Sequence, residues 1–319
     1  MLHLINKQLK IGSLNLSNCL IQGPLAGFSC APFRELFYKF RPPAYTVTEM
    51  ISAHDVVHKH SLTSRYLYRS PKEKTLCYQI SGSDPVLMAK AAVRLESLGA
   101  DLIDINCGCP KEKIRKKGAG SALLEKPEQL ARIVEAVRQA IKIPLTVKLR
   151  IQGPYSDFAL AKNIEEAGAD ALIIHGRRWV DDYDIPADYI HIAQIKSQVS
   201  IPVIANGDIA DQFSLQKAFL KSGCDAFMIA RAGTGKPWLY QSLLEENNFV
   251  TDWDWQSALF LEHLQGLASL EGEFKAVLQS KSLIRYYFRN QLNGETVQAF
   301  YKLTTLKDIA ILLALSNFD

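Results

Sequence analysis

The sequence predicts an α/β protein: a (β/α)8 barrel, or TIM barrel, followed by a small all-helical C-terminal domain. Short runs rich in Ile, Val and Leu alternate with amphipathic segments from residue 19 to about residue 243, an order typical of a parallel sheet covered by helices. Beyond about residue 245 the strand pattern stops, and only helical patterns remain. We therefore expect the barrel in residues 1–243 and the helical domain in residues 244–319.

Each expected strand is a short apolar run suited to burial on both faces. The strands are expected at residues 19–23, 44–49, 75–80, 101–106, 143–149, 170–175, 201–205 and 225–230. Amphipathic helices are expected between them at residues 31–40, 84–98, 127–141, 157–168, 187–198 and 211–222. The connection at residues 50–74 has the least regular pattern, and we expect it to carry an active-site loop.

The two ends of the chain add smaller elements. Residues 10–14 (Lys-Ile-Gly-Ser-Leu) have a hairpin pattern, and this N-terminal piece is expected to cover the bottom of the barrel. The C-terminal domain is expected to form helices at residues 254–270, 273–291, 294–303 and 306–316. The polar stretch at residues 245–248 is expected to link the two domains.

The composition is that of an ordinary globular protein, with 48% hydrophobic and 22% charged residues. No apolar run reaches the roughly 18–20 residues that a membrane span requires. The N-terminus lacks the basic, apolar and small-residue pattern of a secretory signal. Six cysteines are scattered without framework spacing and are expected to be reduced thiols. We therefore expect a cytoplasmic protein with no membrane association.

The strand at 101–106 runs directly into a turn with the sequence Cys107-Gly108-Cys109-Pro110. A thiol placed just beyond a barrel strand is exposed at the end of the barrel where such proteins do chemistry. The Cys-x-Cys spacing does not fit a zinc site, so we expect no metal and interpret the thiol as an acid or nucleophile. Cys107 is expected to be a core residue, and Cys109 is the candidate catalytic group.

Polar or small residues follow most of the other strands and should converge on the same face of the barrel. Because polar groups are costly to bury without partners, a large polar ligand is expected there. Lys148 interrupts an apolar run, and burial there would lower its pKa unless a bound anion stabilised the charged form. Small residues after the last two strands suit a phosphate, and Arg231 offers it a charged fork. These residues are Gln79, Asn106, Lys148, Arg150, His175, Asn206, Gly207, Asp208, Ala230 and Arg231.

A basic run at residues 111–117 follows the cysteine turn directly. It fits a solvated surface segment, and it equally fits contact with a polyanion such as nucleic acid. The sequence leaves these two alternatives open.

Motifs distributed along the barrel together resemble the tRNA-dihydrouridine synthase family. Residues 104–110 (Asp-Ile-Asn-Cys-Gly-Cys-Pro) and 202–208 (Pro-Val-Ile-Ala-Asn-Gly-Asp) carry much of this resemblance. The other matching motifs lie, in order, at residues 23–27, 48–50, 79–82, 146–150, 175–177 and 236–238. The helical tail also matches the family's RNA-binding domain in length and character.

The resemblance implies an enzyme that reduces uridines of tRNA, in the D-loop, to 5,6-dihydrouridine with FMN. Reduced FMN would deliver hydride to C6 of the uracil, Cys109 would protonate C5, and NADPH (or NADH) would be the external reductant. Lys148 would stabilise the anionic reduced flavin. Asn106, Arg150 and Tyr183 would contact the base. FMN would be held by Pro24, Leu25, Ala26, Gln79, Lys148, His175, Asn206, Gly207, Asp208, Ala230 and Arg231.

The partner implied by the resemblance is tRNA, with no obligatory protein partner, and we expect a monomer. In the helical tail, Lys275, Lys281, Arg285 and Arg289 form a basic stripe for RNA, while Tyr286, Tyr287 and Phe288 fit a bundle core. The chain departs from the family pattern at Leu25, at residues 230–232 and in the loop 178–184. Two alternatives stay open: an FMN barrel acting on a free small molecule, and a redox-inactive RNA-binding relative.

Overall fold

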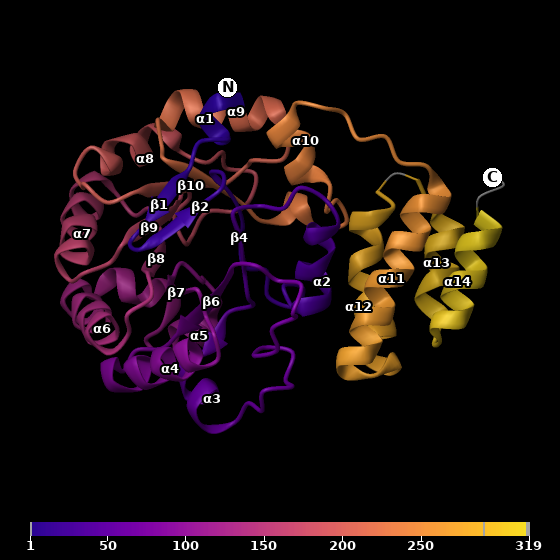
Figure 1. Cartoon of the computed structure of the whole chain (residues 1–319), viewed down its shortest axis with the longest axis horizontal. Coiled ribbons are helices and arrows are strands. Elements are labelled where there is room, and N and C mark those ends of the chain that lie inside the picture. Colours follow the sequence, from indigo (N-terminus) through magenta and orange to yellow (C-terminus); the bar gives the residue numbers. More distant parts are fainter. Residues whose placement is uncertain (1, 290, 317–319) are drawn as a thin grey trace.

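In the computed structural model, which describes residues 2–289 and 291–316, eight parallel strands close into a barrel with helices outside (Figure 1). Closure is complete because β11 pairs with β3 and β4 pairs with β6. The predicted (β/α)8 barrel is therefore confirmed. Its strands are β3 (Leu20–Gln22), β4 (Tyr45–Val47), β6 (Leu76–Ser81), β7 (Leu102–Cys107), β8 (Leu145–Arg150), β9 (Ala171–His175), β10 (Val203–Asn206) and β11 (Ala226–Ile229).

The helices that follow the strands surround the barrel (Figure 1). Several begin at a proline, whose missing N–H is harmless in a first turn. After β3, a short helix continues as a 3-10 turn, Leu36–Lys39, and the irregular connection at 50–74 contains β5 (Ile51–Ser52) and one helix. The helices are α2 (Ala31–Glu35), α3 (Ala53–His58), α4 (Pro85–Ser97), α5 (Glu112–Arg115), α6 (Pro127–Ala140), α7 (Pro154–Glu166), α8 (Tyr189–Lys196), α9 (Gln212–Ser222) and α10 (Leu239–Glu245).

The N-terminal segment forms α1 (Leu2–Ile5) and an antiparallel hairpin of β1 (Leu9–Ile11) and β2 (Leu14–Leu16). Side chains of this hairpin pack against the amino-terminal ends of the barrel strands, among them Leu102 and Ala226. The expected cover on the bottom of the barrel is thus confirmed. The chemistry-bearing ends of the strands remain on the opposite side.

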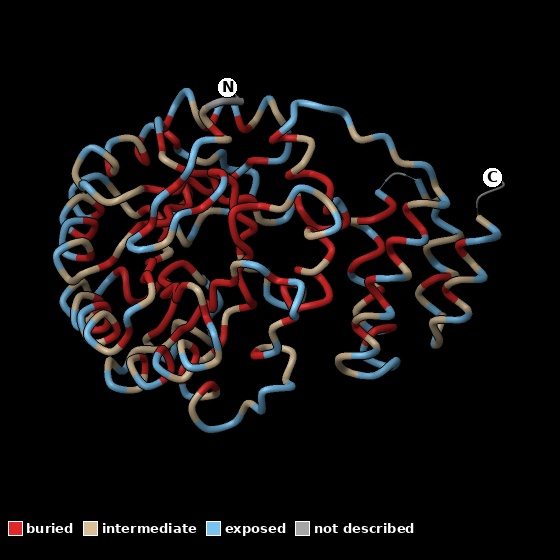
Figure 2. Tube along the Cα trace, viewed as in Figure 1, coloured by how far each residue is buried: buried red, intermediate tan, exposed pale blue. Residues whose placement is uncertain are grey.

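The C-terminal helices stack beside the barrel as α11 (Trp253–Glu271), α12 (Glu273–Tyr287), α13 (Gly294–Lys302) and α14 (Leu306–Leu315) (Figure 1). The helix predicted at residues 273–291 ends earlier, at Tyr287. The predicted domain boundaries also include residues 1, 290 and 317–319, which lie outside the described residues. The buried residues gather in the barrel and, separately, in the bundle (Figure 2), and they form one large apolar cluster in each. No helix in the described ranges is both long and apolar enough to cross a membrane.

The bundle and the barrel share an apolar and polar interface. Cys30 and Leu36, from the segment around α2, belong to the same buried cluster as the bundle residues Phe260 and Tyr287. Arg65, in the 50–74 connection, pairs with Glu49 at 2.7 Å and with Glu271 of α11. This interface places α12 next to the loop that follows β3.

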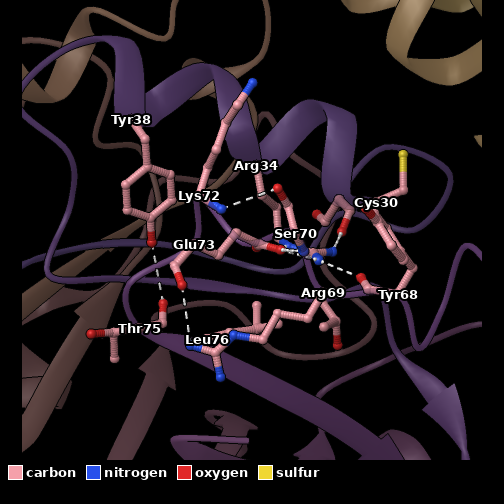
Figure 3. A network of polar contacts seen from close by, with 12 residues as sticks. Cys30, Arg34, Tyr38, Tyr68, Arg69, Ser70, Lys72, Glu73, Thr75 and Leu76 are labelled. Atoms are coloured by element: carbon pink, nitrogen blue, oxygen red, sulfur yellow. Dashed lines mark hydrogen bonds and ion pairs between the residues drawn. The ribbon is translucent and has the colours of Figure 1, made fainter. Parts of the chain in front are cut away.

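A buried ion pair fastens α2 to the 50–74 connection (Figure 3). Arg34 contacts the Glu73 carboxylate at 2.5 and 3.0 Å, and neither side chain is exposed. Arg34 also donates to the carbonyl groups of Ser29 and Tyr68, while Glu73 accepts from the backbone N–H of Ser70. Every polar atom of the pair has partners in fixed positions, which is the condition under which a buried charge pair persists.

Candidate functional site

A cavity of about 760 Å³ opens at the carboxyl ends of the barrel strands, and all of the site residues predicted from the sequence line it. They come from every part of the barrel, which explains their wide separation in sequence. They are Pro24, Leu25, Ala26, Gln79, Asn106, Cys109, Lys148, Arg150, His175, Tyr183, Asn206, Gly207, Asp208, Ala230 and Arg231.

The Cys109 turn is held from two sides. The side-chain oxygen of Asn106 accepts from the backbone N–H groups of Gly108 (3.2 Å) and Cys109 (3.0 Å). Arg150 donates from Nε to the Gly108 carbonyl at 2.9 Å. Gly120 lies against the turn with φ +61°, and a Cβ there would be 2.7 Å from the Cys109 carbonyl oxygen, so only glycine fits. The thiol therefore sits on a rigid turn.

The six cysteines differ sharply in exposure. Cys109 is partly exposed to the cavity, whereas Cys19, Cys30, Cys77, Cys107 and Cys224 are buried. Burial raises the pKa of Cys107 well above its usual value, so that thiol stays neutral and inert. The predicted division between a core Cys107 and an accessible Cys109 is confirmed.

Beneath the turn, three side chains of β6 and β7 form a continuous hydrogen-bonded row. Gln79 Nε2 donates to Asp104 Oδ2 at 2.8 Å, and Asn106 Nδ2 donates to Gln79 Oε1 at 2.8 Å. Thr146 on β8 donates its hydroxyl to Asp104 Oδ1 at 2.6 Å. Gln79 thus reaches the cavity with its amide already engaged by two barrel residues.

Lys148 and His175 form one wall of the cavity, on β8 and β9. Lys148 Nζ donates to the amide oxygen of Asn206 at 3.0 Å, and burial lowers its pKa. Burial, and then the positive charges of Lys148 and Arg150, lowers the pKa of His175 to about 2. His175 is consequently a neutral imidazole at physiological pH, able to donate from one ring nitrogen and accept at the other.

The loops after β9, β10 and β11 close the far end of the cavity. Gly207 has φ +127°, and a Cβ there would lie 2.7 Å from Ala187 Cβ and 3.2 Å from the His175 ring. Asp208 accepts from Arg177 (2.6 Å) and from the backbone N–H of Ala187 (2.8 Å). Its carboxylate therefore joins the loops after β9 and β10. Arg231 lies 3.7 Å over the Tyr183 ring and links the loops after β9 and β11.

A family model described as "Dihydrouridine synthase (Dus)" matches residues 21–314. This chain belongs to the dihydrouridine synthase family. The tRNA-dihydrouridine synthase B of Proteus vulgaris is 40% identical over 238 residues, which cover 74% of this chain and 73% of that one. The protein of the same name from Shewanella oneidensis is 35% identical over 305 residues, covering 93% and 94%.

Solved structures with much lower identity share the barrel of this dihydrouridine synthase family member. An old yellow enzyme homologue from Zymomonas mobilis has a TM-score of 0.59 at 14% identity, covering 78% of this chain and 94% of that one. A 2-naphthoyl-CoA reductase has a TM-score of 0.61 at 14% identity, covering 77% and 53%. At such identities the likeness concerns the fold alone.

Several residues of this family member line the cavity without having been assigned to the site from the sequence. Arg177 is almost fully buried beside Asp208, and Met50 and Lys236 belong to the motifs at residues 48–50 and 236–238, which carry part of the family resemblance. Arg285, Tyr286 and Arg289 of the helical bundle also line the cavity. Of the predicted basic stripe, Lys275 instead pairs with Glu271. Tyr287 and Phe288 enter the bundle core as expected, but the same prediction is wrong for Tyr286, which is only partly buried because it lines the cavity and packs edge-on against Phe28.

The cavity is strongly cationic. Its lining includes two lysines and five arginines, whereas Asp208, itself paired with Arg177, is the one acidic side chain among the described lining residues. The lining cations are Lys148, Lys236, Arg150, Arg177, Arg231, Arg285 and Arg289. A cavity with this excess of positive charge attracts phosphorylated ligands.

The basic run after the cysteine turn divides between two environments. Arg115 contacts Ser121 and Glu125 and lies 3.7 Å over the Trp179 ring. Lys111, Lys113 and Lys117 are exposed close to the rim on which Cys109 lies. Arg115 is thus structural, and the exposed lysines are free to meet solvent or a polyanion.

Proposed function

We propose that this protein is a tRNA-dihydrouridine synthase, which uses FMN to reduce the C5–C6 double bond of a uridine in tRNA, in the D-loop, with NADPH or NADH as reductant. The observation that carries the proposal is a cationic cavity at the end of the barrel with the partly exposed thiol of Cys109 on its wall. Membership of the family and relatives named tRNA-dihydrouridine synthase B support it. Six unpaired cysteines are consistent with a cytoplasmic location.

The residues of the cavity fit FMN. The left-handed Gly207, crowded against Ala187 and His175, lets backbone come close to a ligand where a side chain would intrude. Arg231 suits the phosphate, and Lys148, which lines the cavity and donates to the neutral amide of Asn206, suits the electron-rich ring edge. The floor would be formed by Pro24, Leu25 and Ala26, with Gln79 and His175 as polar contacts and Asp208 and Ala230 beside the phosphate.

Bound FMN, once reduced, would supply the hydride that C6 of the uracil accepts. Cys109, whose partly exposed thiol lies on the cavity wall, would donate the proton to C5. Asn106 and Arg150 hold the Cys109 turn and line the cavity, so a base against Cys109 would also meet these two side chains. Tyr183, stacked on Arg231, would form the edge of the base site.

We propose that residues 1–243 form the FMN-binding catalytic domain and residues 244–319 the tRNA-binding domain; α10, which ends at Glu245, spans this boundary. The target base has to leave the RNA stack to enter the cavity, which costs a few kcal/mol and least in an unpaired loop. Arg285, Arg289 and Lys236 at the mouth would contact the phosphates on either side.

The function is tested by incubating the purified protein, FMN, NADPH and unmodified tRNA transcript, and mapping dihydrouridine by mass spectrometry. We expect a mass gain of two hydrogens at one or a few uridines and a visible flavin spectrum in the purified protein. Equal or greater activity on free uridine would favour a small-molecule oxidoreductase. A colourless protein that binds RNA and cannot take up FMN would favour the redox-inactive alternative.

Arg231→Met is expected to weaken FMN binding about 10- to 100-fold, because a hydrogen bond to a charged group contributes about 1.5–3 kcal/mol. The measurement is a titration of apoprotein with FMN, followed by the quenching of flavin fluorescence. Arg178→Met is the matched control, since Arg178 is exposed, pairs with Asp181 and is not among the cavity residues. An unchanged FMN affinity in Arg231→Met would remove Arg231 from the phosphate site.

Arg285→Glu is expected to weaken tRNA binding by about tenfold or more and to flatten its dependence on salt, because phosphate contacts release counterions. Flavin content should stay near the wild-type level. Gel-shift titrations at several salt concentrations measure both effects. Lys162→Glu makes the same charge change on α7, far from the bundle, and should leave the affinity nearly unchanged (Figure 1). Equal affinities of the two variants would exclude α12 from the RNA surface.

A further inference from the structure

Asp104 is a buried carboxylate that the proposed chemistry does not use. It lies on β7 two residues before Asn106, so both side chains point to the same side of the sheet, into the barrel. Gln79 on β6 is paired in register with Asp104 and lies between the two. All three are nearly inaccessible to solvent, with exposed fractions of 1%, 0% and 8% for Asp104, Gln79 and Asn106.

The two ends of this row have opposite hydrogen-bonding character. At one end the Asp104 carboxylate accepts at both oxygens, from Gln79 and Thr146. Burial raises its pKa to about 7, so at pH 8 it is mostly ionised and only accepts. At the other end the backbone N–H groups of Gly108 and Cys109 only donate. Gln79 and Asn106 are amides, each of which has one donating and one accepting end. One orientation of the pair satisfies every contact: Gln79 donates to Asp104, Asn106 donates to Gln79, and the Asn106 oxygen faces the turn.

We propose that Asp104 is a positioning residue for Cys109, acting through Gln79 and Asn106 as a relay that sets the direction of both amides. A carboxylate at the base of the relay makes the Asn106 oxygen available to the Gly108 and Cys109 N–H groups. With the relay reversed, the NH2 group of Asn106 would face those two donors, and the turn would lose its support. The role assigned to the Cys109 thiol rests on the proposed function, whereas the relay itself is a property of the fold.

Polarity-swapped variants test the relay. Asn106→Asp replaces the amide by a carboxylate, so both of its side-chain oxygens can only accept. If Gln79 keeps its orientation, its own oxygen faces the introduced carboxylate. If Gln79 turns round, its oxygen faces the Asp104 carboxylate instead, so either arrangement brings two acceptors together. Adding Asp104→Asn supplies a donor to the turned Gln79, while the new amide oxygen still accepts from Thr146. Asp104→Asn alone keeps an oxygen available to Gln79, because its NH2 group can donate to the Thr146 hydroxyl.

The measurements are hydrogen exchange of the Gly108 and Cys109 amides and the midpoint of urea unfolding, at pH 8, for purified proteins. The carboxylate introduced by Asn106→Asp can still accept from the turn, but repulsion between facing oxygens in the row should draw it out of place. The exchange should therefore speed about tenfold, as expected when a stabilisation of about 1–1.5 kcal/mol is lost. The double variant should restore exchange to within about threefold of wild type, and Asp104→Asn alone should change it little. Thr146→Val is the control: it removes a different contact of Asp104, and should lower the urea midpoint without faster exchange at the turn.

Additive effects, with the double variant exchanging at least as fast as Asn106→Asp, would overturn the relay. Faster exchange at the turn in Thr146→Val would also overturn it, since loosening would then follow any damage around Asp104. If Asn106→Asp does not fold, recovery of a folded protein in the double variant supports the relay, and failure of both contradicts it. None of these readouts involves flavin or RNA, so they stand apart from the test for dihydrouridine.

Discussion

Cys109→Ala is expected to lower uridine reduction by about 100- to 10,000-fold, the usual contribution of a positioned general acid. The contacts that shape its turn come from backbone groups, namely the N–H of Cys109 and the N–H and carbonyl of Gly108. Removing the thiol therefore leaves the turn and the cavity in place. FMN content and tRNA affinity should stay near wild type, while dihydrouridine formation at saturating tRNA, measured by mass spectrometry, should fall.

Cys107→Ala provides the matched control. It removes a thiol two residues away that is fully buried in the barrel core, so it should lower the stability by about 1 kcal/mol and leave turnover almost unchanged. If Cys109→Ala retained turnover within about threefold of wild type, the acid role would pass to another group or to water. If both variants lost activity equally, the effect would lie in packing around β7.

The chemistry of the site could be predicted from the sequence because it is encoded locally. Each barrel strand is a short apolar run, so the residue that ends it, such as His175 or Asn206, is placed at the same rim by the closure of the sheet. Cys107 and Cys109 could be separated because Cys107 is still within the apolar strand, whereas Cys109 lies in the turn beyond Gly108. These conclusions depend on which strands are neighbours, and in a (β/α)8 barrel the strands are neighbours in the order of the sequence.

Other parts of the site depend on packing between distant segments. Arg285 and Arg289 reach the cavity because the bundle docks on α2 through Cys30 and Leu36, and no local pattern encodes that docking. Arg177 was missed for a related reason. Its role depends on Asp208, whose carboxylate turns toward it from the neighbouring loop.

The short α10 was also not predicted from the sequence. It has seven residues, too few for a clear helical period, and begins directly after the motif at 236–238. Its helix is stabilised by burial of Leu243 and Leu244 in the barrel core, with Tyr240 donating to Gln22 at 2.9 Å. Tertiary contacts thus decide its conformation where intrinsic propensity is weak.

Arg34→Met is expected to destabilise the protein by about 3–5 kcal/mol, because it leaves the Glu73 carboxylate buried without its counter-charge. The free energy of unfolding from urea titration measures the loss. Lys72→Met is the control: Lys72 is largely exposed and pairs with Glu35 at 3.2 Å, so its removal should cost less than about 1 kcal/mol. Combining Arg34→Met with Glu73→Leu should recover much of the stability, since an apolar pair carries no desolvation penalty.

The same substitution should also weaken FMN binding, through a defined chain of contacts. Arg34 donates to the Ser29 carbonyl, and the Ser29 hydroxyl accepts from the backbone N–H of Leu25 at 2.7 Å. Leu25 lies in the loop proposed to form the floor of the flavin site, so losing Arg34 should loosen that floor. FMN affinity, measured at urea concentrations below the unfolding midpoint, should then fall in Arg34→Met and remain normal in Lys72→Met. A destabilised Arg34→Met protein with wild-type FMN affinity would show that the ion pair supports the fold without supporting the site.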